Sequence, residues 1–321
     1  MDKILVNIPV TEEHKRMLEE AAAGIPIEYT KPKLVNEKVT KDATVIIGNV
    51  SHKYVQAAEN LKWVQLNSAG NYGFTKPGVL KPGAKLTNAT GAYGLAISEH
   101  MLGALLMLIK NLNKYYDNQK QHLWHNEGRV SSIYGAKTLV VGLGDIGGEF
   151  AKKMNALGSK VTGIRRHATA VPEYLEAQYQ LDKLDELLPE MDIVALTLPA
   201  YGATDGLFTK ERMMKMKPGA ILINVGRGTL VDNVALAELL NEGILGGALI
   251  DVTDPEPLPE DHPLWDAKNA LITPHVSGGF QLPETLTRIV RIACENLVRF
   301  REGRELRNLV DFETGYKRFE G

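Results

Sequence analysis

The chain has 321 residues, of which 44% are apolar and 24% are charged, and its formal net charge at pH 7 is −2. This length exceeds what one hydrophobic core usually supports, so we expect two domains. The near-average composition excludes a disordered chain, and the small net charge gives no reason to expect nucleic acid or an anionic membrane surface as a partner.

The N-terminal segment and the single cysteine narrow the cellular setting. "MDKILVNIPV" has an acid at position 2 and breaks at Pro9, which predicts a first strand and not a signal peptide. The longest apolar run elsewhere, residues 101–109, is far shorter than the roughly 20 residues of a membrane span. Cys294 is the single cysteine, and no Cys/His spacing resembles a zinc site. We therefore expect a cytoplasmic protein that holds no metal and is not bound to a membrane.

Short apolar runs rich in β-branched residues alternate with helical stretches along the chain. Strands that are buried on both faces have this appearance, and their alternation with helices predicts parallel sheets built from βαβ units. The runs fall into an N-terminal group and a later group, which predicts two sheets. The expected strands are residues 3–8, 25–30, 43–49 and 63–69, followed by 138–142, 160–164, 192–198, 220–226, 247–252 and 270–274.

Between the two groups lies an apolar segment, residues 94–116. Its length and apolar density predict one largely buried helix. Packing within the core is one interpretation, because apolar residues generally prefer the interior. A contribution to a dimer interface is the other.

A glycine-rich loop follows the first strand of the second group. "TLVVGLGDIGGEFAKKM" places Gly142, Gly144 and Gly147 in a G-x-G-x-x-G pattern between an apolar strand and a helix-compatible segment that starts near Asp145 and Ile146. The first glycine allows the tight turn, the second lets the backbone approach a pyrophosphate, and the third lets helix and strand pack closely. This context predicts a dinucleotide site at the loop, with a plain tight turn as the alternative.

The next strand ends in "IRRH", at the position where an NAD-binding unit places an acid for the ribose hydroxyl. Arg165 and Arg166 stand there instead, and no Asp or Glu occurs between Glu149 and Glu173. Arginines at this position accommodate the 2′-phosphate of NADP, so the segment predicts a preference for NADPH, with NAD as the second cofactor. The alternative is a solvated strand end that carries surface arginines.

Polar residues follow three of the later strands. They are Arg227, then Asp251 and Glu256, then His275. Ligands of open α/β sheets bind at the carboxyl ends of strands, and one His, one carboxylate and one Arg suffice for reversible hydride transfer. The His donates a proton to a carbonyl oxygen, the carboxylate fixes its ring, and the Arg holds a substrate carboxylate in a bidentate fork. Asp251 either binds the cofactor or caps the turn that follows it.

Residues 283–306, after the last expected strand, carry apolar residues at three- and four-residue steps, which predicts an amphipathic helix. Such a helix is able to carry the chain back to the first domain.

Five segments resemble, in order and spacing, the signatures of the D-isomer-specific 2-hydroxyacid dehydrogenase family. They are residues 88–112, 135–154, 216–240, 247–265 and 269–279. The resemblance implies an α/β protein with a flavodoxin-like substrate domain, residues 1–100 and 287–321, around a Rossmann-type doubly wound domain, residues 101–286. It also implies a homodimer built on the helix that contains "SEHMLGALLMLI".

The resemblance further implies roles for single residues. Arg227 corresponds to the residue that binds the substrate carboxylate, His275 to the acid/base and Glu256 to its partner. Three residues of the first domain, Ser68, Ala69 and Gly70, occupy the position of the family's substrate loop.

Departures from the family pattern refine these expectations. Most NAD-using members carry Asp where Arg165 stands, and formate dehydrogenases carry Gln where Glu256 stands, so formate is set aside. The short segment after the terminal helix leaves no room for an appended regulatory domain. We therefore predict an NADPH-preferring reductase of a small 2-oxo acid, glyoxylate or hydroxypyruvate first, to the D-2-hydroxy acid. A dinucleotide-sensing interaction protein, similar to the corepressors of the superfamily, is the alternative.

Overall fold

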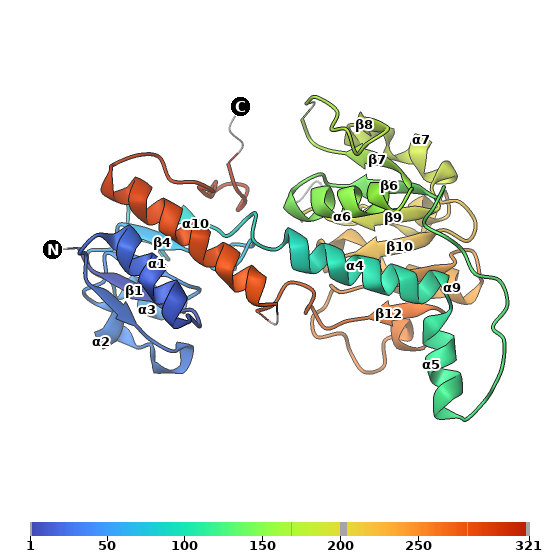
Figure 1. The fold of residues 1–321 in the computed structure, drawn as a ribbon, viewed down its shortest axis with the longest axis horizontal. Helices are drawn as coiled ribbons and strands as arrows, with labels where there is room; N and C mark the ends of the chain where they lie inside the picture. Colours follow the sequence, from blue (N-terminus) through green and yellow to red (C-terminus); the bar gives the residue numbers. More distant parts are fainter. Residues whose placement is uncertain (1, 168, 200–203, 281, 319–321) are drawn as a thin grey trace. The chain divides into compact units, whose positions relative to one another are not determined.

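The computed structural model describes residues 2–167, 169–199, 204–280 and 282–318. The chain forms two compact units, Met1–Tyr93 with Phe280–Gly321, and Gly94–Gly279 (Figure 1). The boundaries expected from the sequence, at 100/101 and 286/287, fall inside two continuous helices, α4 (Gly94–Ile109) and α10 (Pro283–Arg301). The chain instead passes from one unit to the other just before each helix begins, because a helix packs as one body.

The first unit contains a five-stranded parallel sheet with the strand order β2-β1-β3-β4-β5. This 2-1-3-4-5 order is the flavodoxin-like one. Helices α1 and α10 lie side by side in this unit (Figure 1). The strands are β1 (Ile4–Val6), β2 (Ile27–Tyr29), β3 (Val45–Ile47), β4 (Trp63–Gln65) and β5 (Lys85–Thr87), and the remaining helices are α1 (Glu12–Ala22), α2 (Glu37–Thr40) and α3 (His52–Gln56).

The amphipathic pattern of α10 is confirmed. Its predicted apolar face is buried, including Ile289, Val290 and Leu297. At its end, the ring of Phe300 stacks on Trp63 of β4 with 5.6 Å between centroids. The Trp63 indole nitrogen in turn donates to Thr87 Oγ1 at 2.8 Å, so this polar group is satisfied inside the core.

The second unit contains a seven-stranded sheet in which each pair of neighbouring strands is parallel, with the order β12-β11-β10-β9-β6-β7-β8. Counted from β6, this is the Rossmann order 3-2-1-4-5-6 with a seventh strand added, and the order reverses between β6 and β9. The strands are β6 (Lys137–Val141), β7 (Lys160–Ile164), β8 (Ala177–Tyr179), β9 (Ile193–Leu196), β10 (Ile221–Asn224), β11 (Gly247–Ile250) and β12 (Ala270–Ile272). The further helices are α5 (Leu112–Lys120), α6 (Asp145–Ala156), α7 (Leu184–Leu187), α8 (Lys210–Met213) and α9 (Asn233–Asn241).

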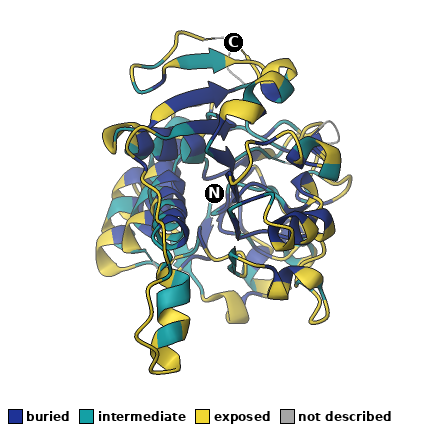
Figure 2. Ribbon diagram, turned by 90° about the vertical axis from the view of Figure 1, so that its right-hand side faces the viewer, coloured by how far each residue is buried: buried dark blue, intermediate teal, exposed yellow. Residues whose placement is uncertain are grey.

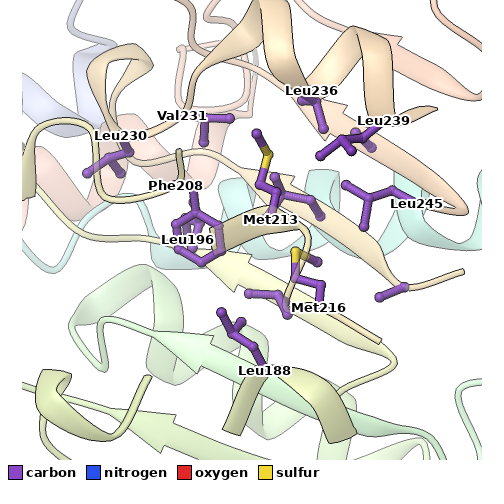
Figure 3. Close-up of a cluster of buried hydrophobic side chains, with 14 of the residues drawn as sticks. Leu188, Leu196, Phe208, Met213, Met216, Leu230, Val231, Leu236, Leu239 and Leu245 are labelled. Atoms are coloured by element: carbon purple, nitrogen blue, oxygen red, sulfur yellow. The ribbon is translucent and has the colours of Figure 1, made fainter. Parts of the chain in front are cut away.

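A buried apolar cluster holds β9 and β10 against α8 and α9 (Figure 3). Three of its side chains are fully buried: Leu196 of β9, Phe208 just before α8, and Met213 at the end of α8. Burial of one such side chain stabilises the fold by about 1.5 to 3 kcal/mol. The cluster therefore fixes the strands whose carboxyl ends lie at the candidate site.

The single helix expected over 94–116 is two helices. Helix α4 ends at Ile109, Asn111 adopts a left-handed conformation with φ 54°, and α5 begins at Leu112 at an angle of 69°. Asn tolerates this conformation, and its amide here donates to the carbonyl oxygen of Arg129 at 3.1 Å. Helix α5 has no buried residue and stands out from the unit in Figure 2.

No one helix in the described part of the chain has both the length and the apolar character to cross a membrane. Only the bent pair of α4 and α5, taken together, meets those two criteria.

Two strands, β5 and β8, were not predicted from the sequence. Each has three residues at the edge of its sheet, and neither "KLT" nor "AQY" contains a continuous apolar run, although Leu86 and Thr87 of β5 are buried.

Candidate functional site

The glycine loop has the geometry that its three glycines predict. Gly142 has φ 107°, which favours glycine. A Cβ on Gly147 would lie 1.9 Å from the Gly142 carbonyl oxygen, whereas a Cβ on Gly144 would meet nothing within 4 Å. The loop is closed on one side by Thr197 at the end of β9, whose hydroxyl donates to the Gly142 oxygen at 2.5 Å. The backbone at Gly144 is thus open to a ligand, while Gly147 is packed tightly.

Helix α6 starts at this open position, with Gly144 as its N-cap. The first N–H groups of a helix have no acceptor within it, and the helix dipole favours an anion there. These features, together with the open space at Gly144, fit the pyrophosphate of a dinucleotide. Ile146 lies partly exposed in this first turn.

The carboxylate of Asp145 is directed at another backbone group. Its Oδ2 accepts a hydrogen bond from the N–H of Gly94 at 2.9 Å, at the first residue of α4. Gly94 is required there, since a Cβ would lie 2.5 Å from Asp145 Oδ1. Asp145 therefore joins the starts of two helices, and the part of this residue suited to a phosphate is its backbone N–H.

Arg165 and Arg166 leave the carboxyl end of β7, next to the glycine loop. The Arg165 N–H donates to the Tyr179 oxygen of β8 at 3.0 Å, and its Nη1 donates to Thr169 Oγ1 at 2.7 Å. The carbonyl oxygen of Arg166 accepts from Gln180 Nε2 at 3.2 Å, and its side chain is exposed. The segment is held to β8 through its backbone, so that two guanidinium groups are presented at this edge.

His275 and Glu256, predicted as a pair, are brought together. His275 Nδ1 lies 2.9 Å from Glu256 Oε2, and Glu256 Oε1 accepts from the Thr253 N–H at 3.1 Å. With the carboxylate on Nδ1, the ring nitrogen Nε2 forms no hydrogen bond within the described residues. The His275 side chain is 44% exposed, so Nε2 is accessible for proton exchange with a ligand.

Asp251 is buried, at 2% exposure, and its side chain contacts the loop that carries His275. Oδ1 accepts from Thr273 Oγ1 at 2.6 Å and from the Val276 N–H at 3.0 Å, and Ser277 Oγ donates to Oδ2. These contacts lie in the loop at residues 273–277 and not in the turn that directly follows Asp251, so they do not match the local capping expected from the sequence. The assignment of Asp251 to the cofactor is not supported by any of these contacts.

Arg227 follows β10, at the start of the short 3-10 helix Gly228–Leu230. Its Nη1 donates to the Gly226 oxygen at 2.6 Å, and Asn224 Nδ2 donates to the Arg227 carbonyl oxygen at 2.9 Å. The half-buried guanidinium keeps further donors for a carboxylate. Strands β10, β11 and β12 are neighbours, so the ends that carry Arg227 and His275 lie two strand spacings apart, about 10 Å.

The expected substrate loop in the first unit is held by its own polar groups. The Ser68 hydroxyl donates to the Gly70 oxygen at 2.7 Å and accepts from Asn49 Nδ2 at 2.9 Å. Asn88 Nδ2 donates to the Ala69 oxygen at 2.9 Å. Ser68 is buried, whereas Ala69 and Gly70 are half-buried, so the loop offers backbone of these two residues to a ligand.

Tyr93 completes the support of this loop, because its hydroxyl donates to the Asn67 carbonyl oxygen. Burial raises the pKa of the Tyr93 phenol, which keeps it a proton donor through the neutral pH range.

Five polar residues whose side chains support the loops of the site were not predicted from the sequence. They are Thr197, Asn224, Thr253, Thr273 and Ser277. Their signal was modest: each lies at or just after the carboxyl end of an apolar strand. In the described part of the chain, no group of three His, Cys, Asp or Glu residues is arranged to hold a metal ion.

A Rossmann-ordered sheet, a glycine loop beside the point where its strand order reverses, and polar residues along its carboxyl edge define an NAD(P)-binding α/β domain. Residues 102–277 match the family model described as D-isomer specific 2-hydroxyacid dehydrogenase, NAD binding domain. The chain therefore belongs to the D-isomer-specific 2-hydroxyacid dehydrogenase family.

Relatives cover nearly the whole chain. A family protein from Aeromonas salmonicida is 32% identical, with a TM-score of 0.85 over 97% of this chain and 99% of that one. A family member from Xanthobacter autotrophicus, solved in complex with NADPH and MES, is 25% identical, with a TM-score of 0.81 over 98% and 99%. The glyoxylate reductase of Thermofilum pendens is 28% identical over 97% of this chain and 95% of its own length.

Other relatives are longer. The D-3-phosphoglycerate dehydrogenases of Methanocaldococcus jannaschii and Archaeoglobus fulgidus are 29% and 27% identical, and the chain spans 60% of each.

Proposed function

We propose that the protein is an NADPH-preferring reductase that converts a small 2-oxo acid, glyoxylate or hydroxypyruvate first, into the D-2-hydroxy acid. The observation that carries this proposal is the pair formed by His275 Nδ1 and Glu256 Oε2 at 2.9 Å, with Nε2 accessible. The pair lies on the same carboxyl edge as the glycine loop, so proton transfer and cofactor binding belong to one unit of the chain.

His275 is the acid/base of the proposed reaction. The cofactor, when bound, supplies a hydride to the carbonyl carbon, and the His275 Nε2–H gives its proton to the carbonyl oxygen, so that the oxo group becomes a hydroxyl. Glu256 accepts the Nδ1–H, which fixes the ring orientation and stabilises the ring when both nitrogens carry protons.

Arg227 binds the substrate carboxylate. One of its donors is used on the Gly226 oxygen, which orients the guanidinium and leaves the other donors for a charge-assisted fork. In the first unit, the family resemblance assigns Ser68, Ala69 and Gly70 to the substrate, and the Ser68 hydroxyl and Asn88 hold the backbone of this loop in place.

The preference for NADPH rests on Arg165 and Arg166. They follow β7, at the position that contacts the adenosine ribose in this fold, and the sequence has no acid there. The Arg165 N–H bonds to Tyr179 and the Arg166 carbonyl oxygen to Gln180, so the backbone that carries both side chains is held at the end of β7.

We also propose that the protein is a cytoplasmic homodimer built on α4, as the family resemblance implies, and that the helix after it, α5, takes part in the association. Three large side chains on α5 and the segment after it are exposed, namely Tyr116, Leu123 and Trp124. Exposed apolar side chains favour association where they form a patch. Sedimentation equilibrium should give a dimer for the wild type and weaker association for Trp124→Ser; a monomeric wild type would contradict the inference.

The experiment that tests the function is an assay of NADPH oxidation with a panel of 2-oxo acids. Turnover with glyoxylate or hydroxypyruvate is expected. His275→Asn should lower kcat by about 10²- to 10⁴-fold, the usual contribution of a general acid, and Arg227→Ala should raise KM for the 2-oxo acid. Binding of NADPH with negligible turnover would favour the alternative of a dinucleotide-sensing interaction protein. The presence of Arg227, Glu256 and His275 argues against that alternative.

A further inference from the structure

A chain of hydrogen bonds runs from the middle of α4 to the loop that carries His275. His100 Nε2 lies 3.2 Å from Thr273 Oγ1, and Thr273 Oγ1 lies 2.6 Å from Asp251 Oδ1. All three residues belong to the second unit, and Thr273 directly follows β12. His100 is half-buried and contacts neither Glu256 nor His275 by a hydrogen bond.

The direction of this chain is fixed by chemistry. The Asp251 carboxylate only accepts, because Oδ1 also takes the N–H of Val276 and both oxygens take donors from Ser277. The single hydroxyl hydrogen of Thr273 therefore points to Asp251, and its lone pairs face His100. His100 must donate through Nε2–H, and it does so whether its ring carries one proton or two.

The end of the chain determines the backbone at His275. The Asp251 carbonyl oxygen accepts the His275 N–H at 2.8 Å, and the Asp251 carboxylate accepts the N–H groups of the next two residues. His275 has φ 53°, in the left-handed region that a non-glycine residue rarely adopts. Such a conformation persists only where the surroundings determine it strongly. Asp251 contributes here through its carbonyl oxygen and carboxylate, and the Thr273 carbonyl oxygen also accepts the His275 N–H at 3.0 Å.

We propose that His100 and Thr273 are positioning residues for His275, acting through the orientation of the Asp251 carboxylate. This inference rests on the proposed function in taking His275 as the acid/base. Neither side chain needs to touch substrate or cofactor for this role. They hold Oδ1 where it receives the Val276 N–H, and thereby hold the imidazole at the angle needed for proton transfer.

Thr273→Val tests the hydroxyl, since it preserves the shape of the side chain and removes both hydrogen bonds. We expect kcat to fall by about 10- to 100-fold, the usual effect of a small misplacement of a reacting group. KM for the 2-oxo acid and Kd for NADPH should stay within about twofold, because Arg227 and the glycine loop are untouched. Thr273→Ser restores the hydroxyl and should recover most of kcat.

His100 is tested by two replacements that differ in one property. His100→Phe keeps a ring and loses the donor, and should reduce kcat in the same way as Thr273→Val. His100→Gln keeps an N–H donor at a similar reach and should retain more activity than the Phe variant.

The chain offers a matched control in its other unit. His14 Nε2 lies 3.1 Å from Thr287 Oγ1, a pair of the same kind between α1 and α10. Thr287→Val removes that pair and should leave kcat and KM unchanged, although it costs a similar hydrogen bond.

Hydrogen exchange gives a measure of the loop that does not depend on turnover. Thr273→Val should speed exchange of the Val276 and Ser277 amides, which Asp251 accepts, and Thr287→Val should not. Unchanged exchange at these amides, or faster exchange with an unchanged kcat, would overturn the proposal. A wild type without turnover on any 2-oxo acid would refute the proposed function, while the exchange rates would still decide whether the chain fixes the loop.

Discussion

If Arg165 and Arg166 bind the 2′-phosphate, as proposed, their joint replacement by Ala should remove the preference for NADPH. A charge-assisted hydrogen bond contributes about 1.5 to 3 kcal/mol, and the lower figure applies to each residue because one side chain is half-buried and the other exposed. The pair then contributes about 3 kcal/mol, so Kd for NADPH should rise on the order of 100-fold. NADH lacks the 2′-phosphate, and its Kd should change by less than about threefold on the same scale.

Titration of both dinucleotides, followed by the fluorescence of the reduced nicotinamide, measures these constants without knowledge of the substrate. Arg16→Ala with Arg304→Ala removes two exposed arginines from the other unit and controls for net charge. The dependence of binding on salt gives a second check, because the screening length falls from about 30 Å at 0.01 M to about 10 Å at 0.1 M. Added salt should therefore weaken NADPH binding more in the wild type than in the variant that lacks Arg165 and Arg166. Equal losses for both dinucleotides, or tighter NADH binding by the wild type, would refute the reasoning.

Three further predictions concern the loop and the histidine pair. Glu256→Gln leaves a hydrogen-bonding group beside His275 but no charge, and steady-state kinetics should show kcat reduced at least about tenfold with NADPH binding retained; an unchanged kcat would exclude the pair. Gly147→Ala should fail to fold stably, since its Cβ would overlap a carbonyl oxygen, whereas Gly144→Ala should melt like the wild type and lose dinucleotide affinity. Normal melting of the first variant, or normal binding by the second, would contradict the loop geometry. Asp145→Asn removes a negative charge beside the pyrophosphate position and should lower Kd for both NADPH and NADH roughly two- to tenfold in the fluorescence titration. A higher Kd would mean that the carboxylate is needed to hold the glycine loop.

The parts of the fold that the sequence predicted are those with a strong local signal. Buried strands such as β6 and β9 are continuous apolar runs, and the face of α10 follows a helical period. The break at Asn111 had no such signal, because Asn is common on helix surfaces and its left-handed conformation depends on the distant carbonyl of Arg129. Strands β5 and β8 were missed because "KLT" and "AQY" hold no run of apolar residues, whereas the edge strands β2 and β12 were predicted.

The residues of the candidate site likewise fall into those that the sequence predicts and those that it does not. Glycine spacing, the Arg pair and the His–Glu pair were visible because their chemistry is tied to residue type. The contacts of Asp251 were not visible, since a carboxylate at a strand end suits either a cofactor or the next turn, whereas this side chain binds Thr273 and Val276, more than 20 residues away. Positioning residues such as His100 depend on a contact between α4 and Thr273, 173 residues apart in the chain, which no short segment of sequence records.

Chiral analysis of the product formed from hydroxypyruvate and NADPH tests the proposed reaction directly. The wild type should produce D-glycerate with stoichiometric oxidation of NADPH, and His275→Asn should produce almost none. Formation of L-glycerate, or the absence of glycerate together with no glycolate from glyoxylate, would contradict the proposed reaction.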